Sequence, residues 1–203
     1  MINVIICSHN RSALLESILK SLEKQSVQPR VWIVDDSDNA DLSGLQDYSI
    51  VHWFSWHRPD GLYHRVAKYN EAMKLIGRGK IVLLDDDCPP VGTRYVEAFE
   101  TLLQEARAVR GLFLDTDGQN KLTPWFSTTN LGLREPRLFD PIFDGRYGYE
   151  DLDLERTLEF EGVRWVEGSA DTAVQHVGPS FSGDRVATQI NESHYRDKWG
   201  LKK

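Results

Sequence analysis

The sequence predicts an α/β protein in which a mostly parallel, doubly wound (Rossmann-like) sheet is flanked by helices. Short apolar runs alternate with segments of helical periodicity through the first half of the chain, as in sheets with crossover helices. Acidic residues directly follow two of these runs. The chain has 203 residues, of which 40% are hydrophobic, so it is long enough for one domain with its own core.

The first half of the chain alternates predicted strands and helices. Runs rich in Val and Ile have strand length and end at polar turns. Apolar residues spaced three and four apart predict helices between them. The predicted strands cover residues 3–7, 31–34, 50–54 and 81–84. The predicted helices cover residues 14–25, 62–76 and 95–106, and glycines stop the second of them.

The second half is less regular, but no linker or repeat separates it from the first. We therefore predict a single domain over residues 1–203. Its predicted strands are 112–114, 125–133, 163–166 and 172–177. An aromatic-rich loop at 139–149 leads into an amphipathic helix at 150–160, and residues 178–183 form a flexible Gly- and Pro-containing loop.

Composition excludes several classes of protein. The net charge is −7 and no basic run is present, which disfavours tight binding of duplex nucleic acid. Cys7 and Cys88 each end an apolar run, as buried thiols do, and do not suggest a disulfide framework. No apolar run is long enough to cross a bilayer, and the first residues do not resemble a signal peptide. We expect a cytoplasmic protein without stable membrane insertion.

Three consecutive carboxylates, Asp85, Asp86 and Asp87, follow the predicted strand 81–84. At a buried strand end they repel one another unless a cation or strong donors neutralise them. Carboxylate oxygens suit Mg²⁺ or Mn²⁺, and a metal there would stabilise a leaving diphosphate. The alternative is a solvated turn of helix-capping aspartates. The apolar strand before the cluster and the Pro-Pro pair after it favour the metal site.

Other polar residues follow the first two predicted strands. Ligands bind outside the carboxyl ends of strands in open parallel sheets, so these residues point to the same rim as the acidic cluster. The Asp36 carboxylate suits an N–H of a uracil-like base, or belongs to an ordinary turn. His9 and Arg11 follow the first strand, where Arg11 meets a phosphate or simply begins a helix. Arg65 lies, with Lys68, on a helix from which one of them reaches the nucleotide, unless both are solvated.

An acidic pair, Glu150 and Asp151, opens the predicted helix 150–160. Acids are common at a helix start, where they complement the helix dipole. The functional interpretation makes Asp151 a general base that takes a proton from an acceptor hydroxyl. Aromatic residues just before the pair would stack on a sugar. His176 ends a later strand, where it is structural or completes the metal shell begun by Asp87.

These motifs, in this order, resemble a family 2 glycosyltransferase of the GT-A fold. The resemblance covers about residues 3–178, nearly the whole chain. It is carried by residues 4–11, 31–37, 84–87, 129–134, 143–154 and 162–166, together with His176. Each motif alone matches the family only loosely, but the presence of all six in the family's order is specific.

The resemblance implies a nucleotide diphosphate sugar donor, often a UDP-sugar, Mn²⁺ or Mg²⁺ as cofactor, and inversion at the anomeric carbon. It assigns residues 1–110 to donor binding and 111–203 to the acceptor. The nucleotide rim is implied at Cys7, His9, Arg11, Asp36, Asp85 and Asp86. Asp87 is implied to bind the metal with His176, and Asp85 to meet the ribose or bridge to the metal. Asp151 is implied to be the base, with Glu150 holding a donor or acceptor hydroxyl.

The sequence departs from the family at two positions. Ser37 replaces a common glycine, and Tyr69 replaces a common arginine, so that Arg65 or Lys68 must substitute for it. The chain also lacks the long extension of polymer synthases, so we expect one sugar per event.

Two alternatives remain at this stage. A nucleotidyltransferase would want a Gly-rich, basic loop after the first strand, which residues 8–11 do not form. A non-catalytic nucleotide-sugar-binding module would not need the acidic residues that are present. The sequence does not decide between four classes of acceptor: a glycan, a lipid-linked glycan, a protein and a modified nucleobase.

Overall fold

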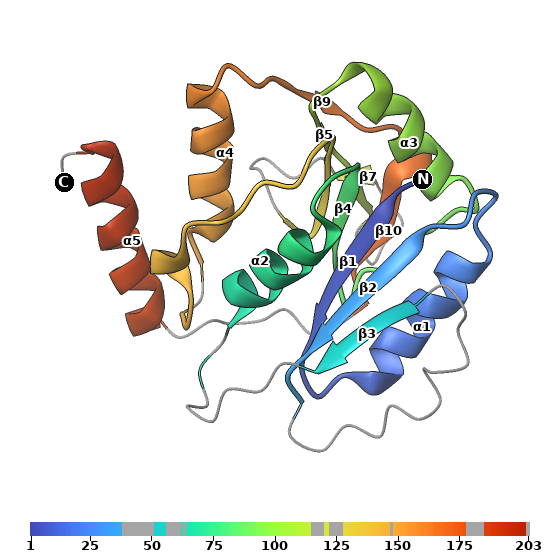
Figure 1. Cartoon of the computed structure of the whole chain (residues 1–203), viewed down its shortest axis with the longest axis horizontal. Helices are drawn as coiled ribbons and strands as arrows, with labels where there is room; N and C mark the ends of the chain where they lie inside the picture. The colour runs from blue at the N-terminus through green and yellow to red at the C-terminus, as the bar shows by residue number, and fades with distance from the viewer. Residues whose placement is uncertain are drawn as a thin grey trace.

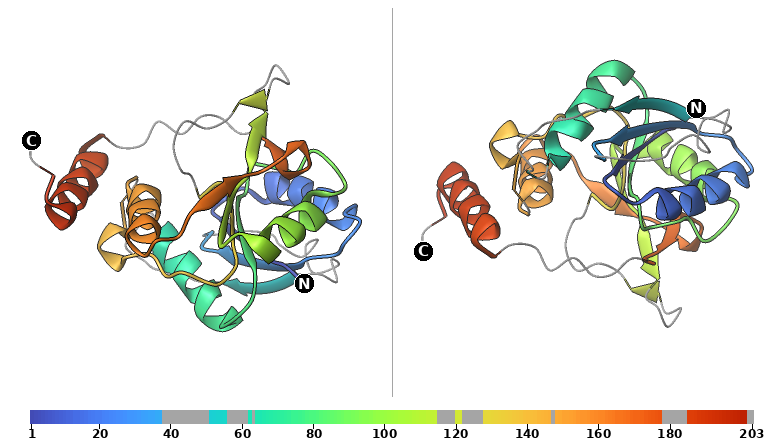
Figure 2. Two further views of the ribbon diagram at one scale, coloured as in Figure 1. Left: turned by 90° about the horizontal axis from the view of Figure 1, so that it is seen from above. Right: turned by 90° about the horizontal axis from the view of Figure 1, so that it is seen from below.

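A computed structural model describes residues 1–37, 51–55, 62, 64–114, 120–121, 128–146, 148–177 and 185–201. The α/β fold predicted from the sequence is confirmed: a twisted sheet is flanked by helices on both faces (Figure 1; Figure 2). A seven-stranded sheet has the order β3-β2-β1-β4-β8-β5-β9, and a three-stranded sheet has the order β10-β6-β7.

The strands of the large sheet are β1 (Asn3–Ser8), β2 (Arg30–Asp35), β3 (Val51–Ser55), β4 (Ile81–Asp85), β5 (Ala108–Arg110), β8 (Asn130–Leu133) and β9 (Trp165–Glu167). The small sheet contains β6 (Leu112–Leu114), β7 (Asn120–Lys121) and β10 (Ala173–Gln175). The described helices are α1 (Ser12–Glu23), α2 (Arg65–Ile76), α3 (Tyr95–Glu105), α4 (Glu150–Phe160) and α5 (Arg185–Trp199), with 3₁₀ turns at Pro141–Phe143 and Ala170–Thr172.

Strand register brings the predicted motifs to one rim of the sheet. The strand β1 pairs in parallel with both β2 and β4. Ser8 is opposite Asp35 on β2, and Cys7 is opposite Asp85 on β4. The carboxyl ends of three neighbouring strands therefore coincide. Because β8 runs antiparallel to β4, its first residue Asn130 pairs with Leu84, and Thr129 arrives beside Asp85.

Two apolar layers form because successive side chains of a strand point to opposite faces. Val4 and Ile6 of β1 join the core beneath α1 and α3, whereas Ile5 joins the core beneath α2 and α4. Leu15, at helical spacing with its neighbours on α1, is fully buried in the first layer. Leu154 of α4 is buried in the second. Both faces of the sheet are thus covered, which explains why the central strands β1 and β4 carry buried apolar residues on both faces.

Asn130 connects the two sheets. Its side chain is fully buried, and its Nδ2 donates to the backbone oxygens of Leu112 and Thr172, both at 2.9 Å. The hydroxyl of Tyr95 donates to its Oδ1 at 2.8 Å. A Cβ at Gly111 would lie 2.2 Å from the Asn130 amide, so a glycine is needed beside it.

Most predicted elements are confirmed, with changes at their ends. The helix α2 begins at Arg65 and not at residue 62, and the strand predicted over 163–166 begins at Trp165. The strand β8 begins at Asn130, because residues 128 and 129 form a turn, and residues 125–127 lie outside the described ranges. The short strand β5 and the helix α5 were not predicted. Within the described residues, no helix has the length and apolarity needed to cross a membrane.

Candidate active site

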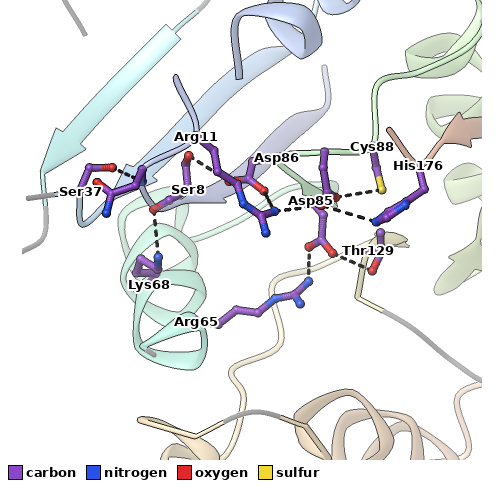
Figure 3. A network of polar contacts seen from close by, with 12 residues as sticks. Ser8, Arg11, Ser37, Arg65, Lys68, Asp85, Asp86, Cys88, Thr129 and His176 are labelled. Carbon is purple, nitrogen blue, oxygen red and sulfur yellow. Dashed lines mark hydrogen bonds and ion pairs between the residues drawn. The ribbon is translucent and has the colours of Figure 1, made fainter. Parts of the chain in front are cut away.

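Polar side chains gather at the carboxyl ends of β1, β2 and β4 (Figure 3). The cluster joins residues far apart in the sequence because the three strands are adjacent in the sheet. The residues predicted at the nucleotide rim all come before residue 88 in the sequence. They lie at these strand ends, in the turns after them or on α2. The rim predicted from strand order is therefore the place where they meet.

The guanidinium of Arg11 bridges two members of the acidic cluster. Its Nη1 donates to Asp86 Oδ1 and to Asp87 Oδ2, both at 2.9 Å. The Ser8 hydroxyl donates to the other oxygen of Asp86 at 3.0 Å. Burial raises the pKa of Asp86, and the Arg11 charge opposes that effect. Arg11 thus supplies a neutralising cation that consecutive carboxylates require.

Asp85 is held by a different cation. Arg65, on the first turn of α2, donates to Asp85 Oδ1 and forms an ion pair with it. The Thr129 hydroxyl donates to Asp85 Oδ2 at 2.8 Å, and the Tyr69 hydroxyl lies 3.4 Å from Oδ1. Figure 3 shows Arg65 and Thr129 converging on this carboxylate from two sides. Of the two cations predicted to substitute at the Tyr69 position, Arg65 is the one that contacts the acidic cluster.

Lys68, the other predicted cation on α2, is buried and not solvated. Its side chain is 2% exposed, and its Nζ donates to Asp36 Oδ1 at 2.8 Å and to the Ser8 backbone oxygen at 3.1 Å. The Nδ1 of His9 lies 3.1 Å from the same Asp36 oxygen. The Asp36 carboxylate is therefore fixed in direction, with its charge compensated, as a group that recognises a base would need to be.

Asp87 and His176 face one another across the rim. The Nε2 of His176 lies 3.5 Å from Asp87 Oδ2. Backbone bonds from Val177 to the Asp87 oxygen, at 2.9 Å, and from Gln175 to the Pro89 oxygen, at 3.0 Å, hold the two segments together. A carboxylate oxygen and an imidazole nitrogen are both common ligands of divalent ions.

The chemistry of this pair fits a divalent ion bound together with a substrate. Among the residues that the structure describes, no three His, Cys, Asp or Glu side chains gather as a complete metal cage. Mg²⁺ is ordinarily bound by one or two carboxylates plus substrate phosphates, so a complete cage is not required. Asp87 and His176 therefore suit an ion whose remaining ligands come from a diphosphate.

The two cysteines are free thiols near the rim. Burial raises the pKa of Cys7 to about 12, and burial also raises that of Cys88. Both stay neutral at physiological pH, and a neutral thiol is a poor nucleophile and metal ligand. Cys7, predicted to line the nucleotide pocket, therefore contributes packing at the end of β1. Cys88 contacts Asp87 Oδ1 through its sulfur at 3.4 Å.

Glu150 and Asp151 begin α4, as predicted. Glu150 is 5% exposed, and its Oε2 has no hydrogen-bond partner among the described residues. Burial, followed by the neighbouring Asp151 charge, raises the pKa of Glu150 to about 7. Burial also raises the pKa of Asp151, which is partly buried. A buried carboxyl pair with raised pKa values is typical of acid-base sites, although ion-pair networks produce such shifts too.

Arg65 links the acidic pair to the rim. Its positive charge lowers the pKa values of both Glu150 and Asp151, against burial, while the Asp85 charge raises them. Arg65 also pairs directly with Asp85. The helix start that carries the predicted base and the strand end that carries the predicted metal site thus lie within electrostatic reach of one guanidinium.

Several residues at this site were not predicted from the sequence. Asp144 accepts from His64 Nδ1 at 2.8 Å and from the Ala67 backbone N–H at 2.9 Å, so it caps the helix that carries Arg65. Asp153 of α4 binds two residues of α5, including Trp199. Asp144 lies in one of the segments that carry the family resemblance. Its contact with His64 could not be predicted, because no pattern in the sequence indicates that the two residues meet. Tyr147, one of the aromatic residues predicted to stack on a sugar, and the flexible loop predicted at 178–183 lie outside the described residues.

A scan against protein-family models gives no match, and a search of curated proteins gives none either. Solved structures do match. Mannosyltransferase PcManGT from Pyrobaculum calidifontis, solved with GDP-Man and Mn²⁺, has a TM-score of 0.64 at 14% identity over 98% of this chain and 71% of its own. S. aureus TarS 1-349, solved with UDP-GlcNAc, has a TM-score of 0.71 at 15% identity over 90% of this chain. The match spans 60% of that TarS chain.

A structure from another class of enzyme is also similar. The 4-diphosphocytidyl-2C-methyl-D-erythritol synthase from Anaerococcus prevotii has a TM-score of 0.56 at 14% identity over 97% of this chain and 96% of its own. At such identities the likenesses establish a fold. That fold is of the GT-A type, so the fold expected from the sequence resemblance is confirmed.

Proposed function

We propose that this chain is a metal-dependent glycosyltransferase that moves one sugar from a nucleotide diphosphate sugar, of the UDP-sugar class, to an acceptor hydroxyl. The observation that carries the proposal is the position of Arg65. It pairs with Asp85 at the donor rim and acts on the charges of Glu150 and Asp151. Inverting sugar transfer needs positive charge beside the leaving diphosphate and a base on the other side of the reacting carbon. Arg65 connects the residues proposed for these two roles, which supports the proposal.

The donor would lie across the carboxyl ends of β1, β2 and β4. Asp36, held by Lys68 and His9, would accept an N–H of the base. The Cys7–Arg11 segment would line the nucleotide, and Asp85 would meet the ribose. Arg11 and Arg65 would then face the diphosphate. Residues 1–110 form the donor half in this proposal, and residues 111–203 the acceptor half.

Asp87 and His176 would hold a Mn²⁺ or Mg²⁺ ion, which supplies positive charge for the departing diphosphate when it is bound. The protein's own contribution is to keep the two ligands in register, through the backbone bonds between the Asp87–Pro89 segment and β10. Arg11 adds a second positive charge at the same place, because its guanidinium already lies 2.9 Å from Asp87.

Asp151 is the proposed general base. As the acceptor oxygen attacks the anomeric carbon, its proton passes to the Asp151 carboxylate, the new C–O bond forms and the bond to the diphosphate breaks. Attack from the face opposite the leaving group inverts the configuration. Glu150 Oε2, buried and without a protein partner in the described ranges, is suited to hold a sugar hydroxyl beside it.

A nucleotidyltransferase is the second candidate, because the synthase from A. prevotii matches this chain over nearly its whole length. Such an enzyme binds a triphosphate, typically with a Gly-rich and basic loop after the first strand. Here that loop contains Ser8 and Arg11, whose side chains are engaged with Asp86. The loop is therefore unlike a triphosphate-binding loop, and it favours sugar transfer over nucleotidyl transfer.

Hydrolysis of a panel of nucleotide diphosphate sugars tests the proposal. Release of the nucleoside diphosphate would be measured with Mn²⁺, with Mg²⁺ and with chelator, for the wild type and for Asp87→Ala. Metal-dependent release from one donor, lost in the variant, is the expected result. Pyrophosphate release from a nucleoside triphosphate would instead support the nucleotidyltransferase. Absence of both activities and of metal-dependent donor binding in calorimetry would reject both candidates.

A further inference from the structure

The C-terminal helix α5 packs beside α4 at the end of the molecule away from β2 and β3 (Figure 1; Figure 2). Its Tyr195 packs against the second core layer, and its polar side chains reach one small region of the chain. That region contains Asp140, Gly148 and the first turn of α4. Glu150 and Asp151 begin the same helical turn.

Asp153 is the first anchor between the two helices. Its carboxylate is 3% exposed and accepts two hydrogen bonds from consecutive residues of α5. Lys198 Nζ donates to one oxygen and Trp199 Nε1 to the other, both at 2.8 Å. A buried carboxylate with a donor on each oxygen is fixed in position and direction. The first turn of α4 is therefore tied to the end of α5.

Asn191 is the second anchor. It is fully buried, and its Nδ2 donates to the Gly148 oxygen at 2.8 Å and lies 3.5 Å from the Phe143 oxygen. The next residue, Tyr149, has a φ of 72°, a left-handed conformation that costs a non-glycine residue free energy. Its ring lies against that of Tyr195 of α5, with 5.5 Å between centroids. The α5 side chains thus contact this turn at both Gly148 and Tyr149.

The start of α4 is capped from within its first turn, where the Leu152 backbone N–H donates to Asp151 Oδ1 at 2.8 Å, and not by the residue before it. Tyr149 occupies the N-cap position and makes no side-chain capping bond. Three acidic residues crowd the first turn: Glu150 and Asp153 are buried, and Asp151 is partly buried. The charged groups that act on Glu150 are Asp151, Arg65 and Asp85, none of which belongs to α5. The contribution of α5 to this pair is thus one of position and not of charge.

We infer that α5 is a positioning element for the acid-base pair, with Asn191 and the Asp153–Trp199 contact as the residues that aim Glu150 and Asp151 at the rim. This inference rests on the proposed function of that pair. Small errors in the position of a reacting group reduce rates strongly, by up to about a hundredfold for 1 Å. Loosening these anchors should therefore slow the chemical step without weakening donor binding. In the part of the chain that the structure describes, the anchors bond to the Gly148 segment and to one another and not to the donor rim.

The test uses the full chain with Asn191→Leu, which removes the donor to Gly148 with little change in size, and Trp199→Phe, which keeps the ring but removes the N–H. Asp153→Asn gives a third variant, and Asp197→Asn, at an exposed position of α5, is its matched control. Donor dissociation constants, hydrolysis rates of the donor found with the wild type, and melting temperatures would be measured for each.

We expect donor affinity within about twofold of the wild type, and hydrolysis slower by roughly tenfold in Asn191→Leu and Asp153→Asn. A purely stabilising helix would change the melting temperature alone. A second readout is the pH titration of the Glu150 carboxyl by ¹³C NMR, assigned with Glu150→Gln. The buried pair should titrate at lower pH once Asn191→Leu exposes it to water, because burial is what raises the pKa of Glu150.

The outcomes separate this inference from the proposed function. If the wild type hydrolyses a donor and the anchor variants match it in rate and in Glu150 titration, α5 is a structural helix and the inference is wrong. If the wild type neither binds nor hydrolyses any donor, the proposed function fails. The titration alone then decides whether α5 fixes the environment of the pair.

Discussion

The imidazole Nε2 of His176 lies 3.5 Å from the Oδ2 of Asp87, although half the chain separates the two residues. The approach is built by backbone bonds on both sides of the pair, from Val177 to Asp87 and from Gln175 to Pro89. The Asp87 carboxylate is also held by Arg11, which donates to the same oxygen at 2.9 Å. If the pair holds a metal ion, these contacts fix one of its two ligands in direction.

Removing one ligand of this pair should weaken metal binding more than nucleotide binding. With UDP present, we expect Asp87→Asn to lower Mn²⁺ affinity by roughly tenfold or more and His176→Ala by about tenfold, since each loses one direct ligand. Isothermal titration calorimetry measures both. Asp171→Asn, at an exposed aspartate, is the control. Unchanged Mn²⁺ affinity in both ligand variants would rule out this site for the ion.

Arg11 should compete with the metal ion in the absence of nucleotide. Its guanidinium lies 2.9 Å from Asp86 and from Asp87, so an approaching divalent ion meets a positive charge. We expect Arg11→Met to raise nucleotide-free Mn²⁺ affinity by roughly tenfold, the size of one partly screened charge interaction. The same variant should bind UDP more weakly. Arg30→Met, at an exposed position of β2, is the control, and lower Mn²⁺ affinity in Arg11→Met would contradict the competition.

Burial of Glu150 makes the stability of the fold depend on pH. Its carboxyl titrates at about 7 in the folded chain, against an ordinary value of 4.5. Between these values the unfolded state binds fewer protons, so this group lowers wild-type stability as pH rises and the loss is complete above about 7. Glu150→Gln removes the titration. We expect its stability relative to the wild type to be greater at pH 8 than at pH 4.5 by about 3 kcal/mol.

Urea unfolding at the two pH values measures this difference. Glu105→Gln, at an exposed position near the end of α3, controls for the loss of one negative charge. A pH-independent effect of Glu150→Gln would mean that the carboxyl is not held in a protonated state by burial.

Much of the fold and of the rim follows from the sequence because both depend on local patterns. The run that becomes β1 and the acidic run after β4 are each continuous in the sequence. Parallel pairing of neighbouring strands then places their carboxyl ends at the same edge of the sheet. The alignment of Cys7 with Asp85 is a direct consequence of this register. The residues predicted from strand ends therefore meet where they were expected.

The parts that were missed depend on contacts between distant segments. The strand β5 is three residues long, and its place between β8 and β9 comes from pairing and not from periodicity. The burial of Lys68 could not be predicted from the sequence. A buried lysine needs a partner for its charge, and here the partners are Asp36 and the Ser8 carbonyl, which come from distant segments. The helix α5 is too polar for its sequence to predict that it packs against the site. It does so through three polar contacts with α4 and with the turn before α4.

Asn130 should be the most costly polar residue to replace in the core. Replacement by Leu keeps the size but leaves the Leu112 and Thr172 carbonyls and the Tyr95 hydroxyl without this partner in the interior. Each orphaned group costs about 1–3 kcal/mol, so we expect Asn130→Leu to lower the free energy of unfolding by about 4 kcal/mol. Tyr95→Phe removes only one of these bonds and should cost about 1 kcal/mol. The urea midpoint, at an unchanged slope, measures both variants, and equal losses in the two would show that the contacts of Asn130 with the small sheet contribute nothing to stability.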